Sequence, residues 1–311
     1  MNYMTNKIVA VQGNHPSKLN PISDTSVFLA SEIQNKKYKI FYYDPKDLSV
    51  INSKVIASGF FIKFDYSKKK FFKILKRQKL DLTKCKFILI RQDPPFNLEY
   101  ISATYMLDNI KNKVKIINNP TSIRNVSEKL YSARYQKYMP NTIFTQNINE
   151  IKKFFKKHKK VILKPIHSYS GNDIHLLNKF NLKLINQFIK KHDHIMCQKY
   201  LPKISKGDKR VFLINGKVCG AISRVPKKGS FLSNMSKGAK PINIQLTKIE
   251  NKISKLIAKD LKKENIFFAG IDFIDQKLNG DINVTSPTGL KTLYDLSGIN
   301  HAKTFWKELK T

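Results

Sequence analysis

Acidic residues are scarce in this sequence. Its 311 residues contain 22 Asp and Glu against 58 Lys and Arg, and the formal net charge at pH 7 is +36. Each carboxylate is therefore informative, whereas a single lysine is not. Asp272 is one of these carboxylates, and it lies within the apolar run 267–274, which reads as a buried strand. An unpaired charge is costly there, so we expect Asp272 to have a partner.

Cysteines and long apolar runs are also few. The three cysteines, Cys85, Cys197 and Cys219, lie far apart, and no Cys-x-x-Cys pair occurs. This pattern favours reduced thiols in a cytoplasm over disulfides or a zinc site. No apolar run approaches the length of a membrane span, and the apolar stretch at 7–11 is too short for a signal peptide. We therefore expect a cytoplasmic protein without a membrane partner.

Arginine is rare among the basic residues, since only six of the 58 are Arg. Only the planar guanidinium group can grip a carboxylate or phosphate with two parallel hydrogen bonds. Arg91, Arg210 and Arg224 each adjoin a predicted strand or its turn, so we expect them to bind anions. We expect structural ion pairs for Arg77 and Arg134.

The lysines are spread along the whole chain, with local runs at 68–70 and 152–160. No zinc-finger, homeodomain or RNA-recognition signature accompanies them. The sequence therefore predicts no specific nucleic-acid partner, although weak and salt-sensitive adsorption to polyanions is expected. A basic polyanion-binding protein without catalytic activity is kept as a remote alternative.

The first part of the chain alternates strands with helices. Strands are predicted at 7–11, 38–43, 87–90 and 114–118, and a helix at 25–35 has Asp24 as its N-cap. This order predicts an open α/β domain over residues 1–121. Arg-Gln-Asp-Pro-Pro-Phe at 91–96 follows a strand and forms a loop at its carboxyl end, which is the usual ligand side of such sheets.

The second part mixes strands and helices without internal repeats. A helix is predicted at 122–135, strands at 161–165 and 195–202, and a type I′ hairpin around Asn215-Gly216. The segment 226–240 reads as a lid loop, and further helices are predicted at 249–263 and 305–309.

A candidate metal site lies in a second predicted hairpin. Residues 275–280 are polar and end in Asn-Gly, a turn signal. If Ile274 faces Asp281, then Asp272 faces Asn283, and all three oxygen-bearing side chains share one face. Such oxygen ligands suit Mg²⁺ together with substrate phosphates. The alternative is a solvated edge hairpin with Asp272 near its rim.

Several motifs together resemble the bacterial glutathione synthetases, which are ATP-grasp ligases. The resemblance runs from near the amino terminus to about residue 288. It rests on six segments in the family's order: Arg-Gln-Asp-Pro-Pro-Phe at 91–96, Glu-Lys-Leu at 128–130, Leu-Lys-Pro at 163–165, Tyr-Leu-Pro at 200–202, Gly-Asp-Lys-Arg-Val at 207–211 and Asp-Ile-Asn-Val-Thr-Ser-Pro-Thr at 281–288.

The resemblance implies a pre-ATP-grasp open α/β domain at 1–121, followed by an ATP-grasp fold at 122–311 with a small lid half (122–200) and a catalytic half (201–311). It implies that ATP, Mg²⁺, γ-glutamylcysteine and glycine meet in one site. An acyl phosphate forms there and glycine displaces phosphate. The family is often tetrameric, so a homo-oligomer is expected. Two Mg²⁺ ions are expected, with Mn²⁺ as a substitute.

The resemblance also implies roles for particular residues. Arg210 and Arg224 would be catalytic, and the metal ligands would be Asp272, Asp281 and Asn283. The substrate-binding residues would be Arg91, Thr285, Ser286 and Thr288. The ATP-binding residues would be Lys129, Lys164, Ser168, Ser170, Gly171, Gln198, Lys199, Tyr200, Leu201, Asp208 and Asn234.

The sequence departs from the family at four places. The glycine-rich phosphate loop reads His-Ser-Tyr-Ser-Gly-Asn-Asp at 167–173, so serine hydroxyls would replace bare amides. Leu232 and Ser233 stand where an arginine is expected, Ala239 replaces a glycine, and Asp281 replaces a glutamate. These changes leave open a diverged carboxylate–amine ligase with another dipeptide or amine.

Overall fold

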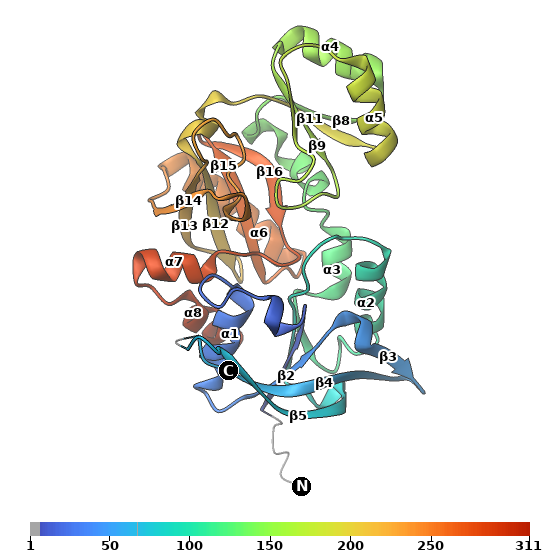
Figure 1. Cartoon of the computed structure of the whole chain (residues 1–311), viewed down its shortest axis with the longest axis vertical. Helices are drawn as coiled ribbons and strands as arrows, with labels where there is room; N and C mark the ends of the chain where they lie inside the picture. Colours follow the sequence, from blue (N-terminus) through green and yellow to red (C-terminus); the bar gives the residue numbers. More distant parts are fainter. Residues whose placement is uncertain (1–6, 67) are drawn as a thin grey trace.

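Three β-sheets make up the computed structural model, which describes residues 7–66 and 68–311. They follow one another along the long axis, with the amino-terminal sheet at one end, a five-stranded sheet in the middle and a four-stranded sheet at the other end (Figure 1). Helices pack against the sheets, as the predicted α/β and α+β classes require. In the described ranges, no helix combines the length and apolarity needed to cross a bilayer.

The amino-terminal sheet has seven strands. Four parallel strands confirm the four predictions for this region: β1 (Ile8–Gln12), β2 (Lys39–Tyr43), β6 (Phe87–Ile90) and β7 (Lys115–Ile117). They are almost fully buried, as the parallel strands of a covered sheet are. Three antiparallel strands that were not predicted extend the sheet beyond β2: β3 (Leu48–Ile51), β4 (Lys54–Phe64) and β5 (Phe72–Asp81).

Three helices accompany this sheet: α1 (Thr25–Gln34), α2 (Leu98–Asp108) and α3 (Pro120–Asn125). Asp24 is the N-cap of α1, as predicted, because its Oδ1 accepts a hydrogen bond from the Val27 amide at 2.8 Å. The loop at 91–96 leaves the carboxyl end of β6, and the Arg91 amide donates to the Gln12 carbonyl at 2.8 Å. The loop therefore begins beside the end of β1.

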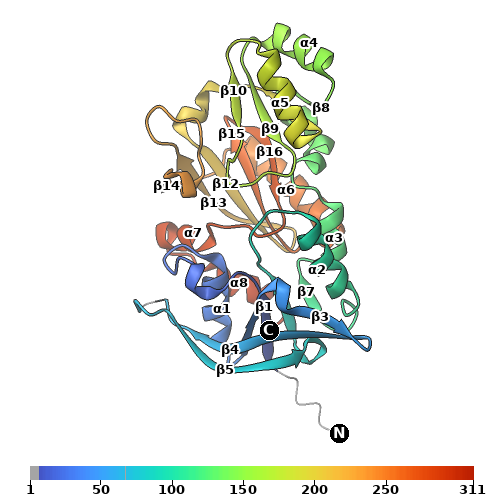
Figure 2. The same ribbon diagram turned by 45° about the vertical axis from the view of Figure 1, so that its right-hand side comes forward.

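The four-stranded sheet is antiparallel, with the order β10-β9-β11-β8. Its strands are β8 (Thr142–Thr145), β9 (Val161–Pro165), β10 (His175–Leu177) and β11 (Ile195–Lys199). Helices α4 (Ile148–His158) and α5 (Leu182–His192) cover one face (Figures 1 and 2) and share a buried core with it. Lys164 and Gln198 thus stand on neighbouring central strands.

The five-stranded sheet has the order β14-β13-β12-β15-β16. Its strands are β12 (Asp208–Ile214), β13 (Lys217–Val225), β14 (Lys240–Asn243), β15 (Phe268–Ile274) and β16 (Lys277–Asn283). The hairpin around Asn215 and Gly216 is confirmed, and positive φ angles of 48° and 77° give the type I′ turn. Helix α6 (Lys248–Lys263) confirms the predicted helix at 249–263 and begins with a capping box.

Two sequence predictions of local structure are wrong. The helix expected at 122–135 is broken, because α3 ends at Asn125 and a 3₁₀ helix (Leu130–Tyr138) follows. Between them the chain turns to bond with β16, where the Ile282 amide donates to the Glu128 carbonyl at 3.0 Å. Helical propensity is overridden here by this tertiary hydrogen bond.

The register expected for the metal-site hairpin is the second wrong prediction. Ile274 pairs with Lys277, and Gly270 pairs with Asn283. The turn lies at Asp275 and Gln276, both with positive φ, and not at Asn279-Gly280. Between the paired ends, three residues of β16 (279–281) stand opposite Asp272 alone, which makes a bulge.

The end of the chain returns to the amino-terminal sheet. Helices α7 (Leu290–Ser297) and α8 (His301–Glu308) pack against α1 (Figures 1 and 2). Trp306 is fully buried, and its Nε1 donates to the Leu29 carbonyl at 2.8 Å. The helix predicted at 305–309 therefore exists but begins four residues earlier.

Candidate active site

One large pocket opens where the three sheet-bearing parts meet, and its volume is about 810 Å³. That size is in the range of small-molecule sites. All the predicted site residues except Arg91 line it. The amino-terminal part contributes Asp24 and Asp93, the four-stranded sheet contributes Lys164, and the five-stranded sheet contributes Asp272 and Asp281.

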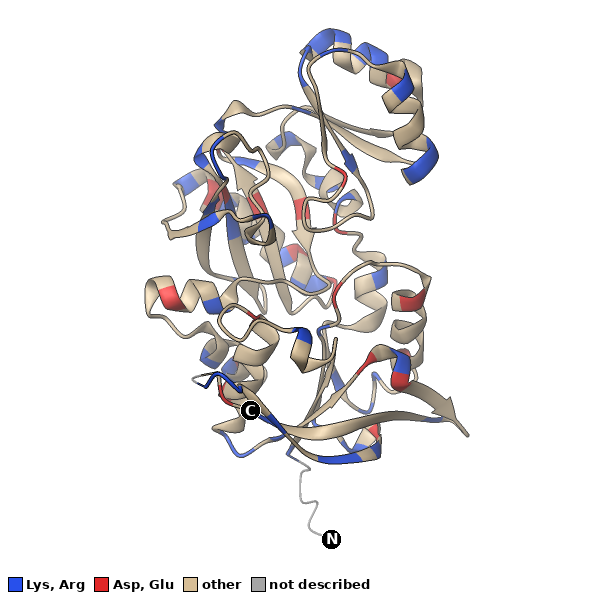
Figure 3. Ribbon diagram, in the orientation of Figure 1, with Lys and Arg blue, Asp and Glu red and all other residues tan. Residues whose placement is uncertain are grey.

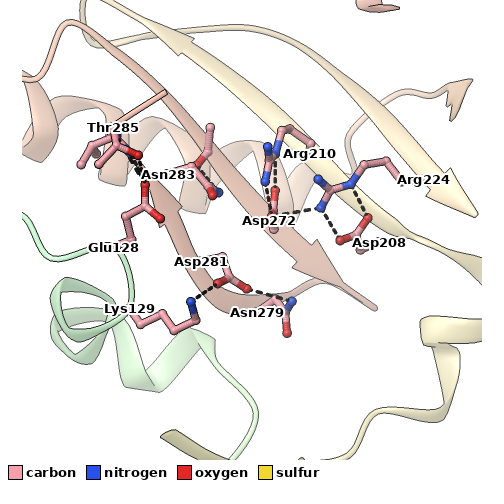
Figure 4. Close-up of polar contacts among 12 residues, drawn as sticks. Glu128, Lys129, Asp208, Arg210, Arg224, Asp272, Asn279, Asp281, Asn283 and Thr285 are labelled. Atoms are coloured by element: carbon pink, nitrogen blue, oxygen red, sulfur yellow. Dashed lines mark hydrogen bonds and ion pairs between the residues drawn. The ribbon is translucent and has the colours of Figure 1, made fainter. Parts of the chain in front are cut away.

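Four buried charges form a closed network on adjacent strands of the five-stranded sheet (Figure 4). Arg210 grips Asp272 with two hydrogen bonds, Nε to Oδ1 at 2.8 Å and Nη2 to Oδ2 at 2.7 Å. Arg224 holds Asp208 in the same two-point manner, with Nε to Oδ1 at 2.8 Å, and its Nη2 also donates to Asp272 Oδ2 at 3.0 Å. The expected partner of Asp272 is thus a pair of arginines.

The network shifts the pKa values of its two carboxylates in opposite directions. Burial alone would raise the pKa of Asp272, but the guanidinium groups of Arg210 and Arg224 outweigh it and hold that pKa well below its usual range. Burial raises the pKa of Asp208, and the nearby Asp272 carboxylate adds to this rise. The guanidinium group of Arg224 opposes the rise only in part. Asp272 is therefore the more strongly ionised of the two.

A second, more open cluster surrounds Asp281. Lys129 Nζ lies 3.5 Å from Asp281 Oδ1, and Lys164 Nζ lies 3.6 Å from Asp281 Oδ2. Lys164 also donates to the carbonyl and the side-chain oxygen of Asn279, both at 2.9 Å. Burial lowers the pKa of Lys164, and Asp281 offsets this effect only in part. The two lysines predicted to bind phosphates thus converge on one carboxylate.

The three predicted metal ligands all face the same pocket despite the wrong register. The bulge in β16 turns Asp281 toward the pocket, and Asn283 fixes its amide by donating from Nδ2 to the Gly270 carbonyl at 3.1 Å. Two carboxylates and an amide in one concave site make a donor set that fits Mg²⁺. Both Asp272 oxygens already accept from guanidinium groups, but each carboxylate oxygen can accept more than one partner.

The predicted phosphate loop follows β9. Lys129 Nζ donates to the Ser168 carbonyl at 2.7 Å, and the Ser168 hydroxyl donates to the Asn172 carbonyl at 2.8 Å. The loop is thus closed by a hydrogen bond from a serine side chain. Gly171 has φ of 72°, and a Cβ there would lie 2.4 Å from Asn234 Oδ1. The phosphate loop and the lid loop therefore touch above the pocket.

The predicted adenine segment lies at the end of β11. The Gln198 side chain is engaged with Thr142, because its Nε2 donates to Oγ1 at 3.0 Å. The Tyr200 ring packs under the Lys160 ammonium group, which is 4.5 Å from its centroid. Apolar side chains line the pocket beside this segment, namely Leu201, Ile162, Ile204 and Ile274. An apolar slot with a strand end at its edge suits a flat base.

Arg91 is the predicted residue that does not line the pocket. It is buried, its Nε donates to Ser26 Oγ at 3.0 Å, and its Nη2 donates to the Pro287 carbonyl at 3.1 Å. Two residues further on, Asp93 does line the pocket and accepts from Asn14 Nδ2 at 2.8 Å. Arg91 therefore supports the wall, and the acid of the same motif is exposed to the cavity.

The loop at 285–288 closes the floor of the site. Thr285 is buried and bonds to Glu128, whereas Thr288 is exposed. The Ser286 hydroxyl is buried and has no hydrogen-bond partner among the described residues. An orphaned hydroxyl in a pocket is typical of a group that a ligand satisfies. Glu128 and Asn279 are functional candidates that the sequence analysis missed. Because acids are scarce in this chain, an acid directly before Lys129 was a signal for Glu128. The sequence contains no comparable signal for Asn279.

The three sheets and the pocket between them have the ATP-grasp fold. The structure resembles D-cycloserine synthetase DcsG (TM-score 0.65, 10% identity, covering 97% of this chain and 99% of that one). It also resembles D-alanyl-alanine synthetase A from Vibrio cholerae (TM-score 0.62, 14% identity, covering 98% and 97%). Likeness at such low identity establishes the fold alone.

The chain belongs to the prokaryotic glutathione synthetase family. The family's N-terminal domain matches residues 8–124 and its ATP-grasp domain matches residues 128–298. The glutathione synthetase of Agrobacterium fabrum is 32% identical over 310 residues, covering 98% of this chain and 96% of that protein. The glutathione synthetase of Buchnera aphidicola subsp. Baizongia pistaciae is 36% identical over 291 residues, covering 91% and 90%. The protein is therefore an ATP-dependent ligase.

Proposed function

We propose that this ligase joins glycine to γ-glutamylcysteine and converts ATP to ADP and phosphate. Membership in the family over nearly the whole chain carries this proposal. The pocket supports it, because buried arginines and lysines and a metal-type donor set suit ATP and substrates rich in carboxylates.

ATP would lie between the four-stranded and five-stranded sheets. The adenine would pack against residues 198–201, and the phosphates would meet Lys129, Lys164 and the loop with Ser168, Ser170 and Gly171. Asn234 from the lid loop would cover them, and Asp208 would act through Arg224 and not directly on adenosine.

Magnesium would be held by Asp272, Asp281 and Asn283. When bound, Mg²⁺ neutralises charge on the phosphates during transfer. We propose two ions, with Mn²⁺ able to replace them, because Asp272 lies on β15 and Asp281 lies in the bulge of β16, so each carboxylate can serve one ion.

The chain's own side chains would position and neutralise the reacting groups. An oxygen of the cysteinyl carboxylate attacks the γ-phosphorus of ATP, the bond from phosphorus to ADP breaks, and an acyl phosphate forms. The glycine nitrogen then attacks the acyl carbon, the carbon–oxygen bond to phosphate breaks, and the amine loses its proton. Arg210 and Arg224 line the pocket, and they would stabilise the charge on the phosphoryl and acyl oxygens.

The amino-acid substrates would occupy the end of the pocket near the amino-terminal sheet. Ser286 and Thr288 would offer their hydroxyls there, and Thr285, whose hydroxyl and amide bond to Glu128, would act through their loop. Asp24 and Asp93 would supply negative charge for the ammonium group of the γ-glutamyl end. Arg91 would act through the Pro287 carbonyl. If Asp93 binds the ammonium group, Asp93→Asn raises the KM for the dipeptide, and an unchanged KM would remove it from this role.

The deciding experiment is the product mass. Purified protein with ATP, Mg²⁺, γ-glutamylcysteine and glycine should yield glutathione and one phosphate per product, whereas a Lys164→Ala variant should release little phosphate. A panel of other amines tests acceptor choice, since the altered phosphate loop leaves a diverged acceptor open. Phosphate release with another amine but not with glycine would replace this proposal.

Three further assignments belong to the same proposal. We divide the chain into an amino-terminal domain (1–121) and an ATP-grasp domain (122–311), and residues 1–6 and 67 of the former lie outside the described residues. We propose a homo-oligomer, following the family's tetramers, which sedimentation can test. We propose a cytoplasmic location, supported by three cysteines without disulfides in the described part of the chain, which fractionation of cells can test.

A further inference from the structure

Glu128 lies where three parts of the site meet, although no role in the reaction has been given to it so far. One carboxylate oxygen, Oε1, accepts from the Thr285 hydroxyl at 2.8 Å and from the amides of Val284 and Thr285 at 3.3 and 3.4 Å. Its carbonyl accepts from the Ile282 amide at 3.0 Å. Figure 4 shows Glu128 and Thr285 pointing toward each other. The side chain and the main chain of Glu128 thus both bond to the carboxyl end of β16 and the residues that follow it.

The next residue in the chain belongs to the ATP side of the pocket. Lys129 Nζ donates to the Ser168 carbonyl of the phosphate loop and lies 3.5 Å from Asp281. None of these contacts uses the Glu128 side chain. The neighbouring residues Glu128 and Lys129 therefore link the two loops. The Glu128 side chain bonds to the loop at 285–288, and the Lys129 side chain bonds to the phosphate loop.

A general packing role does not explain the carboxylate. Glu128 is only partly buried and lines both the pocket and a small side cavity of about 30 Å³, so it is not a packed core residue. Instead, an acid in a chain with few acids gathers three donors on one oxygen. Charge-assisted hydrogen bonds are the stronger kind, and several from one group fix both distance and orientation.

We propose that Glu128 is a positioning residue that sets the loop at 285–288 relative to Lys129. The inference rests on the proposed function. In this role Glu128 aligns the acyl phosphate and the attacking amine, since Ser286 and Thr288 of the loop line the pocket. It leaves the affinity for ATP to Lys129, Lys164 and the phosphate loop.

The test separates alignment from ATP binding. For Glu128→Ala we expect kcat/KM for both amino-acid substrates to fall about 10- to 100-fold, because a hydrogen bond to a charged group and its alignment are lost. The Kd of a non-hydrolysable ATP analogue with Mg²⁺ should change less than about threefold, since the phosphate-binding groups are intact. Equal losses in both quantities would overturn the proposal.

A second readout is coupling between ATP and product. If the acyl phosphate waits for a misplaced amine, water attacks the acyl carbon, phosphate leaves and the dipeptide carboxylate is regenerated. Glu128→Ala should then release clearly more than one phosphate per glutathione. A ratio of one, together with unchanged KM values, contradicts the alignment role.

Two variants guard against a purely structural effect. Glu128→Gln keeps an acceptor oxygen at the same place, so it should recover to within about fivefold of the unmutated protein. Recovery no better than alanine would overturn the hydrogen-bond role. Glu150→Ala is the matched control, because that glutamate lies on α4 with a half-exposed side chain and pairs with its neighbour Lys153.

The outcome can be told apart from a failure of the proposed function. The unmutated protein is assayed first, and absence of glutathione there concerns the substrates and not Glu128. The ATP-analogue measurement and the Thr285→Val variant remain informative in that case with any amine the enzyme accepts. Adding Thr285→Val to Glu128→Ala should cause little further loss, because both remove the same contact; independent losses would count against the proposal.

Discussion

The two charged clusters of the pocket are built in opposite ways. Arg210, Arg224, Asp208 and Asp272 stand on adjacent strands of one sheet, are all buried, and satisfy one another at 3.0 Å or less. Around Asp281, by contrast, the lysines approach no closer than 3.5 Å, and each comes from a different part of the chain.

This difference separates charges that are positioned within one sheet from charges that are positioned by the contact between two sheets. Folding of the five-stranded sheet alone places the arginine network, so its charges are preorganised for a transition state. Lys164 reaches Asp281 only when the four-stranded sheet lies against β16, and its ammonium group is bonded to Asn279 there. The geometry of the open cluster therefore depends on the position of that sheet, and in the proposed function ATP takes the place of Asp281 as the partner of the two lysines.

Breaking the closed network should have the largest effect. Arg224→Ala leaves Asp208 buried without its guanidinium partner, so we expect a loss of about 3–5 kcal/mol in the free energy of unfolding and no measurable ligase activity. Denaturant unfolding followed by circular dichroism measures it. Arg77→Ala is the control, because Arg77 is exposed on β5. A loss below 1 kcal/mol would show that the network is not closed.

Removing Lys164 from the open cluster should lower the activity strongly but leave the stability nearly unchanged. For Lys164→Met we expect kcat/KM for ATP to fall about 10²- to 10³-fold, as for other lost transition-state contacts. The free energy of unfolding should stay within about 1 kcal/mol, because the cost of burying an ammonium group disappears with its hydrogen bonds. A loss of stability as large as that of Arg224→Ala would remove the distinction between the clusters.

The same lysine should give the reaction an alkaline limit. Because burial lowers the pKa of Lys164, its ammonium group loses its proton below the ordinary lysine value of about 10.4. As pH rises through the lowered pKa of the free enzyme, kcat/KM for ATP should fall, since the neutral amine no longer attracts phosphate. A pH profile measures this limit, and Lys164→Arg should shift it upward.

Metal binding should depend on the carboxylate of the open cluster. Asp281→Glu should keep activity, because β16 bulges at this position and tolerates one more methylene, whereas Asp281→Ala should raise the Mg²⁺ concentration at half-maximal rate about 10- to 100-fold. Titration of the initial rate with Mg²⁺ compares them. An active alanine variant with an unchanged Mg²⁺ requirement would remove Asp281 from the metal site.

The sequence predicts most of the regular elements because their periodic signals are local. The parallel strands, the Asn215-Gly216 turn, the Asp24 cap and α6 depend on neighbours within a few residues. The break after α3 does not, since the hydrogen bond between Glu128 and Ile282 joins residues more than 150 positions apart. A helical pattern at 122–135 cannot reveal such a competitor.

The site was predicted as a set of residues better than as a geometry. The wrong hairpin register still left Asp272, Asp281 and Asn283 in one pocket, because the bulge in β16 restored their common orientation. Motif position could not show that Arg91 turns away to the Pro287 carbonyl, nor that Asn279 binds Lys164. Both depend on contacts between residues that lie more than 100 positions apart in the sequence.

The smallest expected effect on activity comes from the contact between the four-stranded and five-stranded sheets. Gly280 has φ of 89°, and a Cβ there would lie 2.2 Å from the end of the Met196 side chain on β11. Gly298 has a similar φ of 72° but open space around it, so Gly298→Ala carries the backbone strain alone. Both variants should lose roughly 1–2 kcal/mol of stability from that strain.

Only Gly280→Ala should also disturb the open cluster. The flexible end of Met196 can give way, so the added loss of stability should be about 1 kcal/mol or less. Yet any shift of β11 and β9 moves Lys164 away from Asn279 and Asp281, and a several-fold rise in the KM for ATP should follow. Arg224→Ala should lower the free energy of unfolding by the same amount in both glycine variants, because the arginine network lies within the five-stranded sheet. An unchanged KM for ATP in Gly280→Ala would mean that the position of the four-stranded sheet does not control Lys164.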